Sequence, residues 1–172
     1  MMRFFTSSAT ALVPWLVPTP NPSRVTNLSP EKTPVQLFDV LLELLLTEDM
    51  PQPVVARRLQ AFLTAARLVP EQLGRTYYIM QGPCGQLTAT FEKPSFRLYQ
   101  VTARLTPAAY AQMKQHAQAL PASPAYASRW QNKWLGWWPR LVVTSPGAGA
   151  KTVMARFLGL LPKQKFIVLT RG

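Results

Sequence analysis

The sequence of 172 residues contains a single cysteine, Cys84, and a single histidine, His116. One cysteine excludes a disulfide within the chain, and the two residues together are too few for the usual zinc clusters. No run of about 18 uninterrupted apolar residues is present, as a membrane-spanning helix would require. We therefore predict a protein with no metal or other cofactor that is intracellular and either soluble or peripheral, in an undetermined compartment.

Acidic residues are scarce, and their distribution is uneven. All seven lie before Lys93, where seven basic residues balance them, whereas residues 93–172 carry twelve Lys or Arg and no Asp or Glu. Cations without internal carboxylates repel one another in a compact chain unless an external anion compensates them. The basic C-terminal half therefore predicts a polyanionic partner. The alternative is a basic surface without function, in a chain from a compositionally biased genome.

Prolines at positions 14, 18, 20, 22, 30 and 34 disfavour a helix near the N-terminus, because proline lacks an N–H and restrains its predecessor. Residues 1–33 are therefore predicted to form an extended proline-rich arm, followed by a single domain over residues 34–172. Trp15 and Leu16 in the arm are candidate anchors for a protein partner. An unstructured leader is the alternative.

Two helices are expected at the start of the domain. Thr33 and Pro34 are a good N-cap and first-turn pair, and apolar residues recur at helical spacing from Val35 to Thr47. After Pro53, a second helix is expected from Val54 to about Leu68. The short loop between these segments predicts a helical hairpin.

Period-two patterns predict three antiparallel strands over Thr76–Gln81, Gln86–Glu92 and Ser95–Leu105, with Cys84 as a structural residue of the first turn. A helix should follow from Thr106-Pro107 to about Leu120. Residues 125–138 are expected to be helical or loop, and a short strand, a helix and a strand should follow at Arg140–Thr144, Val153–Leu161 and Phe166–Leu169. The predicted class is α+β: an N-terminal helical hairpin, then a small antiparallel sheet with packed helices and a basic, aromatic C-terminal half.

Four of the five tryptophans and three cations fall within residues 129–140. Aromatic faces that stack on bases, beside Arg and Lys that bind phosphate, are typical of single-strand recognition. The same combination suits the headgroup layer of an anionic membrane. A third interpretation is structural, because Trp130, Trp134 and Trp137 have the spacing of one helix face packed on a core.

A second feature resembles a degenerate phosphate-binding loop. A strand leads into Ser145-Pro-Gly-Ala-Gly-Ala-Lys151-Thr152, but Ser145 and Ala150 replace the glycines that a nucleotide-binding loop requires. No carboxylate follows to hold a magnesium ion. We expect simple anion binding by Lys151 and backbone N–H groups at the start of the next helix, with a plain connecting loop as the alternative.

The sequence predicts a non-enzymatic polyanion-binding protein, with nucleic acid, either RNA or single-stranded DNA, as the leading partner and a viral or mobile-element ribonucleoprotein as the setting. The first alternative is a matrix-like peripheral membrane protein that binds anionic lipid and a nucleoprotein. The second alternative is a metal-independent nuclease based on His116, or a degenerate phosphate-loop protein. A homo-oligomer is compatible with all of these functions. The candidate anion-binding residues are Arg97, Arg129, Lys133, Arg140, Lys151, Thr152, Arg156, Lys163 and Lys165, and the candidate stacking residues are Tyr99, Trp137 and Trp138.

Overall fold

The computed structural model describes residues 32–47, 50–72, 74–93, 97–121, 124–132, 138–147, 149–161 and 164–172. These residues belong to one compact unit, Lys32–Gly172. The predicted N-terminal arm, with Trp15 and Leu16, lies outside the described residues.

The first helix, α1 (Pro34–Leu46), begins as predicted at the Thr33-Pro34 pair. The Thr33 hydroxyl accepts a hydrogen bond from the backbone N–H of Gln36, and the Gln36 side chain accepts one from the Thr33 N–H. This reciprocal capping box satisfies two donors that the first turn of a helix leaves open. One side of α1 is then fully apolar and buried, through Leu37, Phe38, Leu41, Leu42, Leu44 and Leu45.

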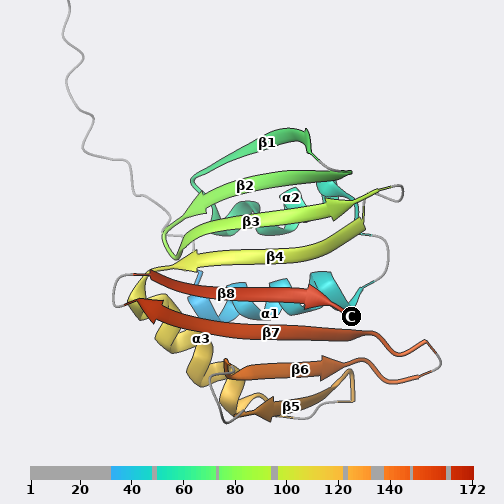
Figure 1. Ribbon diagram of the computed structural model, residues 1–172, viewed down its shortest axis with the longest axis vertical. Coiled ribbons are helices and arrows are strands. Elements are labelled where there is room, and N and C mark those ends of the chain that lie inside the picture. Colours follow the sequence, from blue (N-terminus) through green and yellow to red (C-terminus); the bar gives the residue numbers. More distant parts are fainter. Residues whose placement is uncertain are drawn as a thin grey trace, which may run out of the picture. The chain divides into compact units, whose positions relative to one another are not determined.

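Eight antiparallel strands form one sheet in the order β1-β2-β3-β4-β8-β7-β6-β5 (Figure 1). Each half of the chain contributes a four-strand meander, and the last strands of the two meanders, β4 and β8, pair at the centre of the sheet. The helix α3 (Pro107–Ala119) connects the two meanders. The strands are β1 (Ala65–Gln72), β2 (Arg75–Gly82), β3 (Gly85–Glu92), β4 (Arg97–Leu105), β5 (Ala127–Gln131), β6 (Arg140–Thr144), β7 (Thr152–Leu161) and β8 (Gln164–Arg171).

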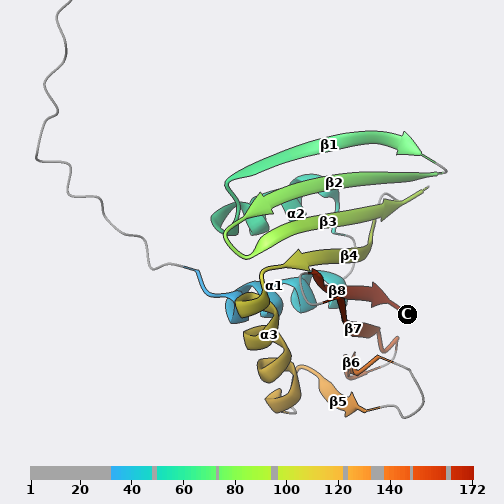
Figure 2. The same ribbon diagram turned by 60° about the vertical axis from the view of Figure 1, so that its left-hand side comes forward.

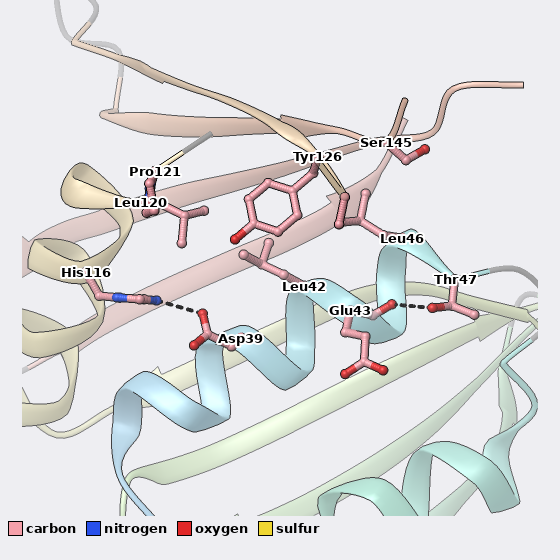
Figure 3. Close-up of a pocket in the computed structure, with 11 residues that line it drawn as sticks. Asp39, Leu42, Glu43, Leu46, Thr47, His116, Leu120, Pro121, Tyr126 and Ser145 are labelled. Atoms are coloured by element: carbon pink, nitrogen blue, oxygen red, sulfur yellow. Dashed lines mark hydrogen bonds and ion pairs between the residues drawn. The ribbon is translucent and has the colours of Figure 1, made fainter. Parts of the chain in front are cut away.

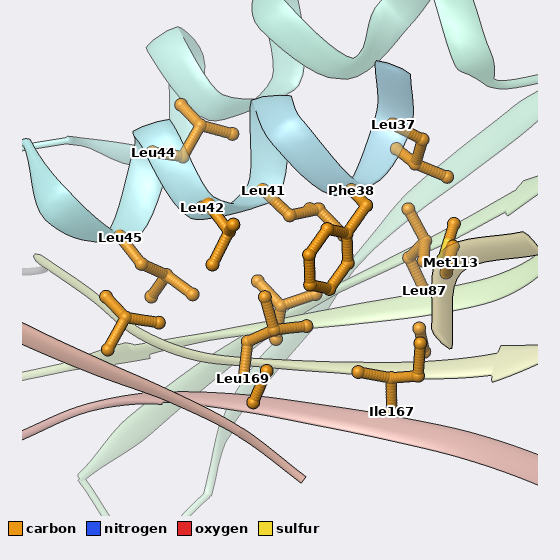
Figure 4. Packing of buried hydrophobic residues seen from close by; sticks show 14 of the residues in the cluster. Leu37, Phe38, Leu41, Leu42, Leu44, Leu45, Leu87, Met113, Ile167 and Leu169 are labelled. Carbon is orange, nitrogen blue, oxygen red and sulfur yellow. The ribbon is translucent and has the colours of Figure 1, made fainter. Parts of the chain in front are cut away.

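The helices α1, α2 (Gln52–Leu59) and α3 lie on the same side of the sheet (Figure 2). α1 lies against the central strands β4 and β8 and against β7, and α3 packs beside it on β4 and β8. The core fills the layer between the helices and the sheet, where Phe38 of α1 approaches Phe157 of β7 with ring centres 6.1 Å apart. Figure 4 shows the leucines of α1 above Ile167 and Leu169 of β8. Each fully buried Leu, Ile or Phe contributes about 1.5–3 kcal/mol by leaving water.

The turn between β2 and β3 brings Gly85 against the end of β4. Gly85 has a φ of 130°, and a Cβ at this position would lie 2.1 Å from the carbonyl oxygen of Arg104. Only glycine meets both requirements. Cys84 in the same turn is buried, as expected of a structural residue.

The predicted fold class, an α+β domain that opens with a helical hairpin and carries a small sheet, is wrong. The expected second helix ends after eight residues in α2, continues for one 3-10 turn, η1 (Gln60–Phe62), and gives way to the edge strand β1. Residues 127–131, expected as helix or loop, form β5, and the expected helix over Val153–Leu161 is the ten-residue strand β7. The sheet that results is one large antiparallel sheet and not a small one.

The errors have one physical cause. The segments over β1 and β7 are rich in Ala, Leu, Met and Arg, which favour a helix when the segment is considered alone. β7 lies between β6 and β8, and pairing with both neighbours, together with burial of Val153, Ala155 and Phe157 on one face, overrides that preference. The predictions for β2, β3, β4, β6, β8, α1 and α3 are confirmed, with shifts of a few residues at the ends.

Candidate functional site

None of the described helices covers the second face of the sheet, which we call the open face. Side chains alternate between the two faces of a strand, so the open face is made by the residues between those of the core. On β4, for example, Val101, Ala103 and Leu105 are buried under the helices, whereas Thr102 and Arg104 point the other way. Burial alternates in the same way along β6, β7 and β8, whereas residues 65–68 of the edge strand β1 are exposed on both faces.

Strand register places one row of open-face residues across the full width of the sheet. The paired residues along this row, from β1 to β5, are Arg67, Ile79, Thr88, Thr102, Val168, Arg156, Arg140 and Gln131. The adjacent core row contains Leu68, Tyr78, Ala89, Val101, Leu169, Ala155, Leu141 and Trp130, most of them buried. The row therefore places three arginines on the open face, opposite a core row that is buried on the five strands from β3 to β6 in sheet order.

All the described cations that the eight strands place on the open face are arginines. They come from six of the eight strands. Arg140 is half-buried and the others are exposed. These arginines are Arg67, Arg75, Arg97, Arg104, Arg129, Arg140 and Arg156. Glu92 is the only acidic residue of this face whose side chain the structure describes, and its carboxylate lies 3.6 Å from the guanidinium of Arg75. The net charge of the described open face is therefore strongly positive.

Polar and sulfur contacts hold two of these arginines in place on β6 and β7. Arg140 donates from Nε to the side-chain oxygen of Gln131 at 2.6 Å. The sulfur of Met154 lies 3.9 Å from Nη1 of Arg140 and 3.4 Å from Nε of Arg156, so it accepts from both guanidinium groups. A shallow hollow of about 460 Å³ opens beside them, lined by Arg129, Trp130, Gln131, Asn132 and Arg140.

Aromatic residues occupy the other half of the open face. A register shift in the pairing of β3 with β4 leaves Tyr99 as an extra residue. The guanidinium carbon of Arg75 lies 5.3 Å from the centre of the Tyr99 ring, which places that ring on the open face. Tyr77 points to the same face from β2, two residues from Arg75, and both tyrosines are half-buried.

Neutral side chains lie between the arginines in the middle of the open face, including the half-buried Phe166 of β8 and Leu158 of β7. β3, β4 and β8 present the hydroxyls of Thr88, Thr102 and Thr170, with Val168 and Gln100 among them. The Gln100 amide donates to the Thr102 hydroxyl at 3.0 Å. The described arginines therefore surround a neutral floor that offers hydroxyl and amide groups.

The structure brings five of the predicted site residues together on the open face: Arg97, Arg129, Arg140, Arg156 and Tyr99. Thr152 points to this face as well, and its hydroxyl lies 3.3 Å from that of Thr144. Lys165 lies on the helical side, with its ammonium 3.5 Å from the carbonyl oxygen of Gly159 and 5.8 Å from the centre of the Tyr110 ring. Trp138 is half-buried just before β6, and Lys133, Trp137 and Lys163 lie outside the described residues.

The prediction of an anion site at a helix N-terminus near Lys151 is wrong, because β7 and not a helix follows this residue. The loop instead closes a β-hairpin. The backbone N–H of Ser145 donates to the Lys151 carbonyl at 2.9 Å, and the Lys151 N–H donates to the Ser145 hydroxyl at 2.9 Å. The segment that follows Lys151 therefore supplies no helix N-terminus for an anion.

Sequence reasoning missed three arginines of the open face, Arg67, Arg75 and Arg104, and also Tyr77. Arg67 lies within the segment predicted as the second helix, so its position on a sheet could not be recognised. For Arg104 and Tyr77 the period-two pattern was recognised, but it does not say which of the two faces the helices cover. That choice depends on contacts between segments that are distant in sequence.

Trp130 belongs to the core side of β5. Its ring centre lies 5.3 Å from that of Phe157, and its indole N–H donates to the Asn132 side chain at 2.7 Å. The structural interpretation of this tryptophan is therefore the better one, although the element is a strand and not the helix that the spacing suggested. Trp134 and Trp137, the other members of the predicted face, lie outside the described residues.

A second hollow, of about 520 Å³, lies on the helical side between α1, α3 and the segment that leads into β5 (Figure 3). His116 of α3 and Asp39 of α1 face each other at its margin, with Nε2 and Oδ1 2.6 Å apart. Its apolar lining includes Leu42, Leu120 and Tyr126. The carboxylate holds one nitrogen of His116, and the edge of that ring packs against Phe38 at 6.1 Å between centres.

Among the described residues, no three His, Cys, Asp or Glu side chains are grouped as metal ligands, and no helix has the length and apolar character to cross a membrane. No protein-family model, no curated protein and no solved structure matches this chain.

Proposed function

We propose that the protein binds nucleic acid on the open face of its sheet and catalyses no reaction there. The observation that carries the proposal is the register of the sheet, which gathers arginines from six strands on one face and places one described carboxylate among them. A nucleic-acid backbone supplies anions at regular spacing, and arginine binds phosphate with two parallel N–H donors.

The polar floor between the arginines supports the same proposal. Hydroxyls of Thr88, Thr102 and Thr170 can donate to phosphate oxygens or to base edges and can accept from sugar hydroxyls. Such groups are of little use in a contact with lipid acyl chains, which needs exposed apolar side chains. The large apolar residues that are exposed among the described ones are Val54 and Leu68, and Leu68 points to the helical side from β1. We therefore favour nucleic acid over the anionic membrane surface of the matrix-like alternative.

The nuclease alternative is less well supported. His116 lies on the helical side, and none of the open-face arginines is among the residues that line its hollow. A general base has to reach the substrate proton directly or through one water. A ribonucleoprotein setting and a viral or mobile-element source stay predictions from the sequence.

The test is a titration of the full chain, after nuclease treatment and repurification, with labelled single-stranded RNA, a DNA duplex and phosphatidylserine vesicles at two salt concentrations. The variant removes Arg140 and Arg156 together, as R140Q/R156Q. The matched control removes two cations from the helical side, Arg57 of α2 and Lys114 of α3, as R57Q/K114Q.

We expect salt-sensitive binding to nucleic acid, at least about tenfold weaker in R140Q/R156Q and little changed in the control, because each charged hydrogen bond contributes roughly 1.5–3 kcal/mol. The slope of log affinity against log salt should fall by about 0.7–0.9 for each lost phosphate contact. Binding to vesicles alone, or an equal loss in both variants, would overturn the proposal.

A further inference from the structure

We infer that the open face takes an unpaired strand in preference to a duplex, and that this strand lies across the β-strands, with bases on Tyr77 and Tyr99 and phosphates on Arg140 and Arg156. The inference rests on the proposed function, and it names the class of nucleic acid and its path.

The first observation is the position of the tyrosines. Tyr99 projects from the irregular site in β4, Tyr77 projects from β2, and both rings are half-buried on a face that no described helix covers. A base can stack on an exposed tyrosine ring only when its own face is free, which requires an unpaired strand. The Arg75 guanidinium over the Tyr99 ring adds a cation to the stacking site.

The second observation is the separation of the two groups. Five steps between neighbouring strands lead from Tyr77 on β2 to Arg140 on β6, through β3, β4, β8 and β7. At about 4.8 Å for each step, the separation is about 24 Å. A ligand that engages both ends therefore has to be an extended chain of several nucleotides, and the hydroxyls of the floor lie along its path.

The third observation concerns duplex recognition. Proteins that recognise a B-form duplex insert a helix or a two-stranded ribbon into the major groove, or lay a sheet on the minor groove and wedge apolar side chains between base steps. The described open face presents no helix and no separate ribbon, because the helices lie on the other side of the sheet and the strands belong to one continuous layer. It also presents no exposed wedge among the described residues, since the exposed large apolar residues, Val54 and Leu68, lie on the helical side. A duplex on this face would meet the arginines through its phosphates, and its stacked bases would offer no free face to Tyr77 or Tyr99.

The experiment compares a labelled single strand with a blunt duplex of the same sequence. The strand has about 12 nucleotides, which is within the usual length range of single-strand binding sites. The variant is Y77L/Y99L, which keeps apolar bulk and removes the aromatic faces. The control is Y126L, on the helical side. Circular dichroism and the melting temperature establish that each variant is folded.

We expect the wild-type protein to bind the single strand more tightly than the duplex. Y77L/Y99L should lose about 5- to 150-fold in single-strand affinity for each stacked base, with an unchanged salt slope and unchanged duplex binding. Equal affinity for both probes overturns this inference, and so does a folded Y77L/Y99L protein that binds the single strand normally. In either case the proposed function still stands, provided that R140Q/R156Q weakens binding. Absence of binding to both probes overturns the inference and the proposed function together.

Discussion

The guanidinium of Arg75 lies over the ring of Tyr99, with 5.3 Å between the guanidinium carbon and the ring centre, and the carboxylate of Glu92 lies 3.6 Å from the same guanidinium. These three residues come from β2, β4 and β3, and they place a cation, a stacking surface and an anion beside one another. Glu92 is the one described carboxylate of the open face. It therefore competes with any bound phosphate for Arg75.

Replacing Glu92 by glutamine should strengthen nucleic-acid binding. Exposed charge pairs contribute roughly 0.2–1 kcal/mol, so releasing Arg75 from this pair should raise affinity about 1.5- to 5-fold at low salt. The measurement is a titration with the single-stranded probe at two salt concentrations. E43Q, which removes a carboxylate of the helical side that pairs with Arg58, is the matched control and should leave affinity unchanged. Weaker binding by E92Q would contradict the proposed position of the strand.

Replacing Arg171 by methionine should lower stability without weakening nucleic-acid binding. Arg171 points to the helical side of β8 and donates to the carbonyl oxygens of Leu45 at 2.9 Å and Thr47 at 2.6 Å, at the end of α1. Cations at a helix C-terminus stabilise the helix dipole and satisfy open carbonyls. We expect a loss of about 1–3 kcal/mol in the free energy of unfolding, measured by urea denaturation.

Lys165 offers the comparison for Arg171, because it lies on the same strand and the same side. Its ammonium approaches a single carbonyl, that of Gly159 at 3.5 Å, so K165M should cost less than R171M. Equal losses would show that charge alone, and not the contacts with the end of α1, accounts for the effect.

Cys84 should react slowly with iodoacetamide in the folded protein. Burial raises the pKa of its thiol, because the thiolate loses hydration. The reactive thiolate should therefore form at a higher pH in the folded chain than in the urea-unfolded chain, and the measurement is the labelling rate against pH in both states. Rapid labelling of the folded protein near neutral pH would contradict the buried position.

The raised pKa of the Cys84 thiol also predicts how the free energy of unfolding changes as the pH rises. In alkaline solution the unfolded thiol loses its proton at a lower pH than the folded one, so ionisation favours unfolding. This contribution is absent below the ordinary thiol pKa and grows as the pH rises toward the folded value. C84A should therefore lose less stability than the wild type on moving from neutral to alkaline pH. Tyr110, whose pKa burial also raises, stays as a common background in both proteins.

Replacing His116 by alanine should leave nucleic-acid binding and the integrity of bound RNA unchanged. His116 joins α3 to α1 through its contact with Asp39, and it lies on the side of the sheet opposite the open-face arginines. We expect a stability loss of about 0.5–1.5 kcal/mol from the lost hydrogen bond. RNA cleavage by the purified wild-type protein that H116A abolishes would instead establish the nuclease alternative.

Local signals in the sequence predicted many elements but not their assembly. Thr33-Pro34 and Thr106-Pro107 mark the starts of α1 and α3, because an N-cap hydroxyl and a first-turn proline act within one turn. Alternation over Thr76–Gln81 and Gln86–Glu92 likewise identified β2 and β3. β1, β5 and β7 were missed, since their strand conformation depends on pairing with β2, β6 and β8 and not on the propensity of their own residues.

The sequence by itself determined that the chain is cationic over its second half, that a single cysteine excludes a disulfide within the chain, and where several helices and strands begin. Composition and short-range spacing carry that information. Only the tertiary structure decided that Arg67 and Arg75 from the first half lie on one face with Arg140 and Arg156 from the second. β4 and β8 pair at the centre of the sheet, and burial of one apolar face against the helices leaves these four arginines, two from each meander, together on the other.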